Sequence, residues 1–184
     1  MASDPGAVLV VGATDREVAP VDGARTLVCG IGPVESAAAT ARALAEERPG
    51  AVLQVGIAGA NGLPPLSVVL GSEALYCDAA GPLVPARAQP DATLLARLRD
   101  AFPDAYVRPI GTSARVGGGH GVDVEAMEGF AVLRACELAR VPAVEVRVIA
   151  NEIAEPDRRR WHFDEAFALL AELLPELVAV ASAR

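Results

Sequence analysis

Apolar runs and amphipathic segments alternate along most of this chain. The runs are mostly continuous and do not alternate strictly in polarity, which is typical of strands covered on both faces. They predict strands at residues 7–11, 26–29, 51–55, 68–76, 106–110 and 143–150. Apolar positions at helical spacing predict helices at residues 34–47, 92–101, 127–139 and 164–181. This alternation predicts one α/β domain over residues 1–184, with three α/β/α layers and a mixed central β-sheet.

Glycine and proline gather in three places, at residues 62–65, 81–90 and 117–121. Each cluster lies between two predicted elements, so we interpret all three as loops inside the domain and not as linkers between domains.

Composition limits the function classes. With 184 residues and 52% hydrophobic content, the chain is long enough for one well-buried core and short for two. A net charge of −8 argues against nucleic acid as a partner, because phosphate backbones are bound by basic surfaces. No run reaches the ~18 apolar residues of a membrane span, and the first residues lack a signal pattern. We therefore expect a cytoplasmic protein without a membrane partner.

All sixteen basic residues are arginine, so no lysine is available for a Schiff base or a phosphate-binding loop. The cysteines Cys29, Cys77 and Cys136 are far apart in apolar surroundings, which favours buried reduced thiols. The two histidines, His120 and His162, offer no metal-ligand spacing. We expect neither a metal nor a cofactor.

The most informative segment is 124–132, Val-Glu-Ala-Met-Glu-Gly-Phe-Ala-Val, followed by the apolar run 143–151. It places Met127 and Glu128 at the start of a helix and Asn151 at the carboxyl end of the next strand. Open α/β sheets hold ligands at such ends, and the helix dipole favours an acidic residue there. By itself, a glutamate in a first helical turn is common and indicates nothing more.

Three glycine turns precede this segment, in Val8 to Val18, Cys29 to Ser36 and Leu53 to Ala60. The first carries a carboxylate, Glu17, five residues after its glycine. The third closes a strand with small residues, Ile57-Ala58-Gly59, which let a ligand approach backbone N–H groups. Each turn alone is weak evidence of function.

Together and in this order, the four segments resemble the nucleoside phosphorylase and nucleosidase family, whose members cleave the N-glycosidic bond of nucleosides. The resemblance runs from Val8 to about Leu174, and its most specific parts are the Met-Glu helix start and the Arg-Val-Ile-Ala-Asn strand end. It implies a nucleoside phosphorylase-like fold, a small-molecule nucleoside substrate, and a homodimer or higher homo-oligomer.

The resemblance also implies roles. Glu17 is the candidate for positioning and deprotonating water, and Asn151 is the candidate for binding the leaving base. Glu128 is the candidate for accepting hydrogen bonds from the ribose hydroxyls, with Met127 beside the sugar. An asparagine amide both donates and accepts, which suits the edge of a 6-oxopurine such as hypoxanthine.

Each role has a competing interpretation. Asp15 lies two positions before Glu17, and Glu125 lies three positions before Glu128. A carboxylate on a loop is often only solvated, and an asparagine at a strand end is often only a turn residue.

The base pocket departs from the family pattern. The segment 111–123 is shorter than usual, and Arg115, followed by Val116, falls where relatives commonly place an aromatic residue. We expect Ile57, Ala58, Gly59, Arg115 and Val116 to contact substrate, because an arginine plane can stack on a purine.

The attacking group follows from two positions on the third predicted strand. Phosphorolytic relatives bind phosphate there with an arginine and, three residues later, a hydroxyl; here these positions are Gln54 and Ile57. Without the cation and the hydroxyl, a phosphate dianion would be poorly stabilised, so we predict hydrolysis. The alternatives are a methylthioadenosine or adenosylhomocysteine nucleosidase, for which aspartate is expected in place of Asn151, and a non-catalytic nucleoside-binding member.

Overall fold

The computed structural model describes residues 7–79, 81–117 and 121–183. The strands are β1 (Val8–Gly12), β2 (Ala24–Val28), β3 (Ala51–Ala60), β4 (Val68–Tyr76), β5 (Arg87–Ala88), β6 (Tyr106–Thr112), β7 (Val124–Ala126) and β8 (Ala143–Glu152). The helices are α1 (Pro33–Glu46), α2 (Ala92–Ala101), α3 (Gly129–Ala139) and α4 (Phe163–Ser182), with a 3-10 turn, η1 (Arg158–Arg160).

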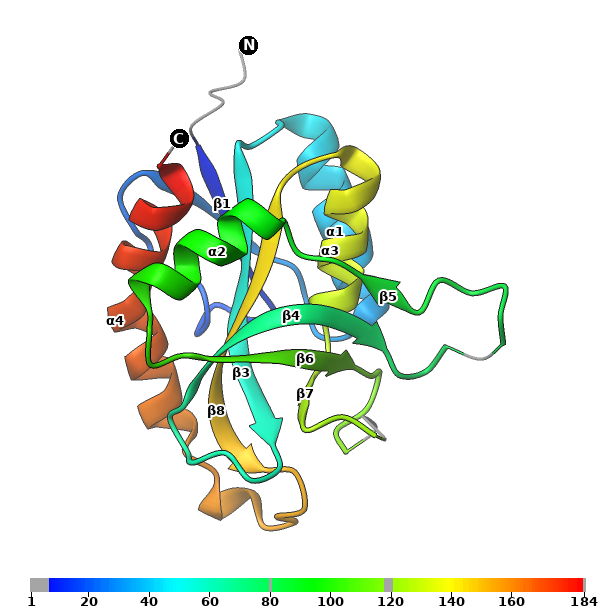
Figure 1. Cartoon of the computed structure of the whole chain (residues 1–184), viewed down its shortest axis with the longest axis vertical. Coiled ribbons are helices and arrows are strands. Elements are labelled where there is room, and N and C mark those ends of the chain that lie inside the picture. The colour runs from blue at the N-terminus through cyan, green and yellow to red at the C-terminus, as the bar shows by residue number, and fades with distance from the viewer. Residues whose placement is uncertain (1–6, 80, 118–120, 184) are drawn as a thin grey trace.

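Helices cover both faces of the sheet (Figure 1). Helices α2 and α4 contact each other and lie on one face, and α1 and α3 contact each other on the other. Each face has its own buried cluster, because the apolar strand residues point alternately to the two sides. The predicted three-layer α/β/α arrangement around a mixed sheet is confirmed.

The sheet also closes partly on itself, which the sequence did not predict. Strands β2, β1, β3 and β8 are parallel neighbours, and β8 pairs antiparallel with β4. Strand β4 pairs with β6, β6 with β7, and β7 returns to β3. This ring encloses a small apolar cluster that includes Val69, Ile110 and Ile149. It sets the ends of β3, β7 and β8 side by side.

Several boundaries differ from the predictions. Strands β3 and β8 each continue to ten residues, and the two- and three-residue strands β5 and β7 were missed. Helix α3 begins at Gly129, two residues later than predicted, because Glu128 adopts the N-cap position and uses its side chain elsewhere. Thr112 Oγ1 instead accepts from Phe130 N at 2.8 Å and satisfies one of the free N–H groups at the helix start.

A register shift in β8 decides where Asn151 lies. Ala58 pairs with Ile149, but the next residue, Gly59, pairs with Asn151 and skips Ala150. Such a bulge turns the residues after it relative to those before it. Asn151 therefore does not continue the side-chain row of Arg147 and Ile149.

Among the described residues, no helix is both long and apolar enough to cross a membrane. His120 and the middle of the predicted loop at 117–121 lie outside the described residues.

Candidate active site

A cavity of about 280 Å³ lies at the ends of β3, β7 and β8, beside the start of α3. The loop after β1 and the segment from η1 to the first turns of α4 complete its wall. This is the region where α/β sheets bind ligands, beyond the carboxyl ends of parallel strands.

All nine residues predicted to form the site line this one cavity. They are Glu17, Ile57, Ala58, Gly59, Arg115, Val116, Met127, Glu128 and Asn151. They come from five separate segments, so the fold brings together positions up to 134 residues apart in the chain, from 17 to 151. Their individual roles remain predictions.

Glu17 is 5% exposed and held by backbone donors. One oxygen accepts from Thr14 N at 2.9 Å, and the other accepts from Ile57 N at 3.3 Å. Burial raises the pKa of Glu17, Arg147 opposes that rise, and Glu128 adds to it. Asp15, the competing carboxylate, is exposed and does not line the cavity. The geometry therefore favours Glu17 over Asp15.

Glu128 is buried and bridges two structural elements with its carboxylate. Its Oε1 accepts from Gly32 N at 3.1 Å, and its Oε2 accepts from Arg147 Nη2 at 3.2 Å. The Glu128 side chain makes no cap bond to α3 and lines the cavity, where each oxygen keeps a further lone pair for a ligand. Glu125, the competing residue, also lines the cavity, and its Oε1 accepts from Gly117 N at 2.6 Å.

Arg147 was missed as a site residue. It is 1% exposed on β8 and lies behind the cavity wall, where its guanidinium joins Glu128 to Glu145 and also donates to Ile57 O at 3.3 Å. Burial disfavours its charge, but the carboxylates of Glu145, Glu128 and Glu17 outweigh burial and raise its pKa. The sequence signal was present, because Glu145 and Arg147 are the two charged residues within the apolar run 143–150, all of which is buried in the structure.

Asn151 offers an amide to the cavity. Its Nδ2 donates to Glu152 O at 2.9 Å, which leaves its second N–H and its carbonyl oxygen for a ligand. Gly59 permits this placement, because a Cβ there would lie 3.0 Å from Nδ2. The register shift and this glycine together aim the amide into the cavity.

An aromatic wall not included in the prediction completes the cavity. It consists of Trp161, Phe163 and Phe167, with Arg158 and Ile31 nearby. Trp161 and Phe163 lie 5.3 Å apart between ring centroids, and the Arg158 guanidinium lies 5.5 Å from the Trp161 ring.

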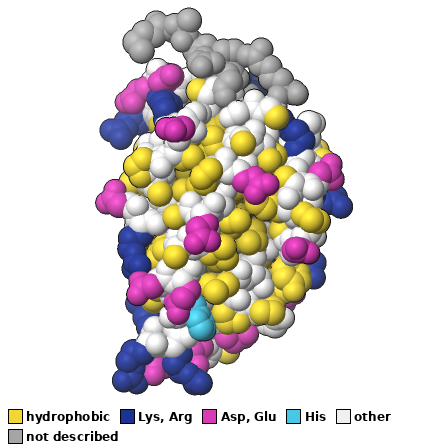
Figure 2. Space-filling view, turned by 90° about the vertical axis from the view of Figure 1, so that its left-hand side faces the viewer, with side chains coloured by type: hydrophobic (Ala, Val, Ile, Leu, Met, Phe, Trp, Pro, Cys, Tyr) yellow, Lys and Arg dark blue, Asp and Glu magenta, His cyan; other side chains and the backbone are white. Residues whose placement is uncertain are grey.

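Arginines 158–160 are not equivalent. Arg159 pairs with Asp157 at 2.8 Å, and Arg160 pairs with Glu155 at 2.9 Å. Figure 2 shows basic and acidic side chains mixed at the end of the molecule where Figure 1 places η1. Of the three, only Arg158 lines the cavity, and within the described part of the chain it has no recorded carboxylate partner. Arg158 is therefore the arginine positioned to meet a ligand.

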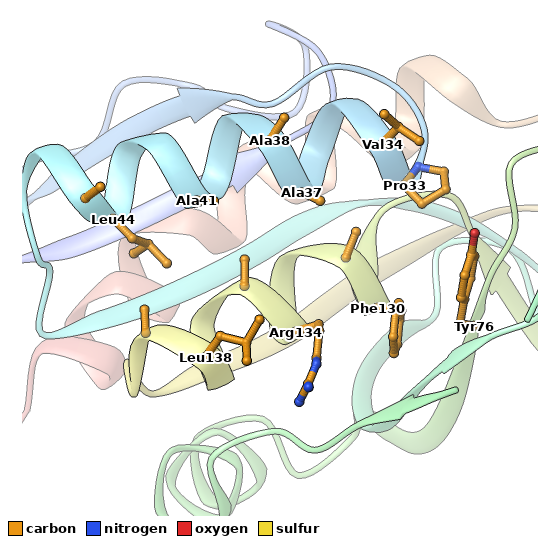
Figure 3. Close-up of a pocket in the computed structure, with 14 residues that line it drawn as sticks. Pro33, Val34, Ala37, Ala38, Ala41, Leu44, Tyr76, Phe130, Arg134 and Leu138 are labelled. Atoms are coloured by element: carbon orange, nitrogen blue, oxygen red, sulfur yellow. The ribbon is translucent and has the colours of Figure 1, made fainter. Parts of the chain in front are cut away.

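A larger cavity of about 800 Å³ lies elsewhere, between α1 and α3 (Figure 3). Its walls are alanine, leucine and valine side chains with Tyr76 and Phe130, whose rings stack at 5.0 Å, and Arg134 is its one charged residue. Its lining, as far as the structure describes the chain, includes neither a carboxylate nor a side-chain amide for bond cleavage, so the smaller cavity is the candidate active site. The described residues contain no group of three or more side chains placed to hold a metal ion.

Comparison with known proteins decides the family. The family model described as the phosphorylase superfamily matches residues 22–118, which is more than half of the chain. The chain belongs to the phosphorylase superfamily. A 60-residue segment is 38% identical to the futalosine hydrolase of Streptomyces coelicolor, a match that covers 33% of this chain but only 26% of that relative.

Solved structures confirm the superfamily's fold in this member. The 5′-methylthioadenosine/S-adenosylhomocysteine nucleosidase of Helicobacter pylori is similar with a TM-score of 0.83 at 15% identity, covering 94% of this chain and 97% of that one. The futalosine hydrolase of the same organism gives 0.82 at 15% identity with the same coverage. The corresponding nucleosidase of Neisseria meningitidis gives 0.76 at 22% identity, covering 96% and 98%.

Proposed function

We propose that this phosphorylase-superfamily member is a nucleosidase that hydrolyses the N-glycosidic bond of a 6-oxopurine nucleoside. The observation that carries the proposal is the meeting of Glu17, Glu128 and Asn151 in one cavity. Cleaving a ribosyl C–N bond needs a base for water, contacts to the sugar and a group that stabilises the leaving base. The three side chains supply one of each.

The reaction consumes one water molecule and needs no co-reactant besides proton exchange with solvent. Glu17 takes a proton from water as the water oxygen bonds to C1′ of the sugar. The C1′–N bond breaks, and its electron pair leaves with the base, whose developing charge Asn151 stabilises by hydrogen bonding. The purine anion then takes a proton from solvent water, and Glu17 returns the proton that it took to solvent. Glu128 accepts from the sugar hydroxyls and favours the positive charge that builds on the ring. The retained pair of carboxylates argues against a non-catalytic binding protein.

Water is the proposed attacking group, because the surroundings of Glu17 disfavour phosphate. Gln54, at the position of the phosphate-binding arginine in phosphorolytic relatives, is fully buried and does not line the cavity. Ile57 offers no hydroxyl, and its N–H already donates to Glu17. Two carboxylates, Glu17 and Glu128, repel a dianion at this place.

We expect hydrolysis to be independent of phosphate. Incubation with a 6-oxopurine nucleoside in phosphate-free buffer should release free base and free sugar in equal amounts. Adding phosphate should change neither the rate nor the products, which chromatography with mass detection measures. Formation of a sugar 1-phosphate would contradict the hydrolase assignment.

The proposed substrate is futalosine, with release of hypoxanthine and dehypoxanthine futalosine in menaquinone biosynthesis. The similarity to the Streptomyces coelicolor enzyme supports it, and so does the aromatic and basic part of the cavity lining. The resemblance implies an aromatic carboxylate on the substrate, and Trp161, Phe163 and Arg158 offer aromatic surface and a cation for such a group. Asn151 disfavours the alternative, an adenine-releasing methylthioadenosine or adenosylhomocysteine nucleosidase.

A substrate panel tests this choice. With inosine, futalosine, aminofutalosine and methylthioadenosine, we expect the highest kcat/KM for futalosine. Arg158→Gln should lower kcat/KM for futalosine by about 10-fold, the size of one charge-assisted hydrogen bond, and leave inosine nearly unchanged. Arg159→Gln, on the neighbouring paired arginine, is the matched control. An equal loss on both substrates would remove Arg158 from substrate recognition.

We also propose a homodimer or higher homo-oligomer that uses the apolar face between α1 and α3. Val34 and Leu138 are 76% and 70% exposed there, and Leu83, on the β4–β5 connection that projects from the same side, is 94% exposed (Figures 1 and 3). A groove and an apolar projection on one side fit a second copy reciprocally. Light scattering that finds a single-chain mass would contradict this.

A cytoplasmic location is proposed as well, in line with the free thiols of the three cysteines, and cell fractionation tests it.

A further inference from the structure

A buried carboxylate behind the cavity has no assigned role. Glu145 is the third residue of β8, with 0% of its surface exposed, and lies two residues before Arg147 on the same side of the strand. Burying a charged side chain in a sheet is costly unless it is paired. Its recorded pairing is with Arg147, whose Nε donates to Glu145 Oε1 at 2.9 Å.

The neighbouring backbone is built around this carboxylate. A Cβ on Gly129, the first residue of α3, would overlap both oxygens of Glu145. On the other side, a Cβ on Gly71 would lie 3.2 Å from the Cβ of Glu145. Gly129 does not have the positive φ that would explain a glycine by backbone conformation. Glycine at this position is therefore explained by the space that Glu145 needs.

The Glu145 carboxylate also fixes the direction of the guanidinium. With Nε held by Glu145, the two remaining nitrogens of Arg147 point to Glu128 Oε2 at 3.2 Å and to Ile57 O at 3.3 Å. Ile57 is the residue whose N–H donates to Glu17. Because the guanidinium group is planar and rigid, fixing the direction of Nε also fixes the directions of its other two nitrogens.

The other Glu145 oxygen, Oε2, is buried and has no hydrogen-bond partner among the described residues. It lies against the start of α3, where the helix dipole favours negative charge. A buried acceptor left unsatisfied costs stability, so a purely structural role would be served better by an apolar residue. This cost is a second indication that Glu145 serves the site.

We propose that Glu145 is a positioning residue that acts through Arg147 to hold Glu128 in place for the sugar, and that Gly129 is required to make room for it. The inference rests on the proposed nucleosidase function, whose sugar-binding carboxylate it orients. It assigns no contact between Glu145 and substrate.

Paired variants test the hydrogen bond separately from the fold. Glu145→Leu removes the acceptor, and we expect kcat/KM to fall by about 10- to 100-fold, with KM rising as kcat falls, because a small displacement of a sugar-binding group is enough for such a loss. Glu145→Gln keeps an oxygen that accepts from Nε and should stay within about fivefold of the natural protein. A variant that merely folds less well would lose active protein without a change in KM. Thr40→Val on α1 is the matched control, because it removes a buried hydroxyl that has no hydrogen-bond partner within the described part of the chain.

A double-mutant cycle tests whether Glu145 acts through Arg147. In a protein that already carries Arg147→Met, adding Glu145→Leu should lower kcat/KM by less than about a further twofold. Gly129→Ala should lower kcat/KM as Glu145→Leu does, because the added methyl group displaces the Glu145 carboxylate. Once that carboxylate is removed by Glu145→Ala, adding Gly129→Ala should lower kcat/KM no further.

The outcomes separate this inference from the proposed function. A natural protein that cleaves none of the panel nucleosides overturns the nucleosidase assignment and the inference with it. The inference alone is overturned if the natural protein is active but Glu145→Leu leaves kcat/KM unchanged. It is also overturned if Glu145→Leu lowers kcat/KM by the same factor in the natural protein and in Arg147→Met.

Discussion

Glu17→Gln should lower kcat by ~10²-fold or more, with little change in substrate binding, as expected when a general base is removed. The glutamine amide keeps one accepting oxygen, so it can accept from the backbone N–H of Thr14 or of Ile57, but not from both as the two carboxylate oxygens do. Steady-state kinetics on the best panel substrate, together with a binding titration, measures the two effects separately.

The exposed neighbour in the same loop provides the control. Asp15→Asn removes a carboxylate two residues away that does not line the cavity, and its activity should stay near that of the natural protein. If Glu17→Gln keeps full activity, or if Asp15→Asn causes the larger loss, then the carboxylate assignment is wrong.

The pH dependence of kcat/KM should also identify Glu17 as the base. Burial raises the pKa of Glu17, so the base is ionised only above its usual titration range, and kcat/KM should rise with pH along a limb centred above 4.5. This limb should be absent from Glu17→Gln.

The free energy of unfolding should fall as the pH rises, whereas kcat/KM should rise. A raised carboxyl pKa in the folded state means that the stability contributed by Glu17 is fully present below its unfolded pKa and is lost as the pH rises through the folded pKa. Glu17→Gln should therefore be no less stable than the natural protein at neutral pH, which thermal melting measures. Replacing an active-site group often preserves or raises stability at the expense of activity.

Local patterns were sufficient for the helices and for most of the sheet. Helix α2 has the predicted bounds, because Asp91 caps it by accepting from Leu94 N at 2.8 Å and an aspartate before an amphipathic run is a local signal. The central strands were visible as continuous apolar runs. Their far ends were not: β3 continues through Ile57, Ala58 and Gly59, because β8 pairs with it along nearly its whole length. Pairing between distant segments is not written in either segment alone.

The same limit explains the missed parts of the site. Strand β7 has three residues and exists because β3 and β6 hold it from both sides. Arg147 and Glu145 were visible as charges in an apolar strand, but the second carboxylate that Arg147 binds, Glu128, comes from another element, just before α3. The direction of Asn151 depends on one skipped residue in the β3–β8 register. Residue types at strand ends were predictable, whereas side-chain orientation required the assembled sheet.

Asn151 is the position at which one atom should decide the preferred base. Its amide donates and accepts whatever the pH, whereas an aspartate donates only when it is protonated. A 6-oxopurine nucleoside should therefore be the better substrate of the natural protein. In Asn151→Asp, a protonated carboxyl can donate to N7 while its carbonyl oxygen accepts from a 6-amino group.

Asn151→Asp should shift preference towards 6-amino nucleosides, here aminofutalosine relative to futalosine. A mismatched buried hydrogen bond costs ~1 to 3 kcal/mol, so the ratio of the two kcat/KM values should change by roughly 10- to 100-fold. The gain on the 6-amino substrate should grow as the pH is lowered, because only the neutral acid donates. Asn61→Asp, at an exposed position just after β3 and outside the cavity, controls for the added charge. An unchanged ratio in Asn151→Asp, or an equal change in Asn61→Asp, would exclude Asn151 as the residue that reads the base.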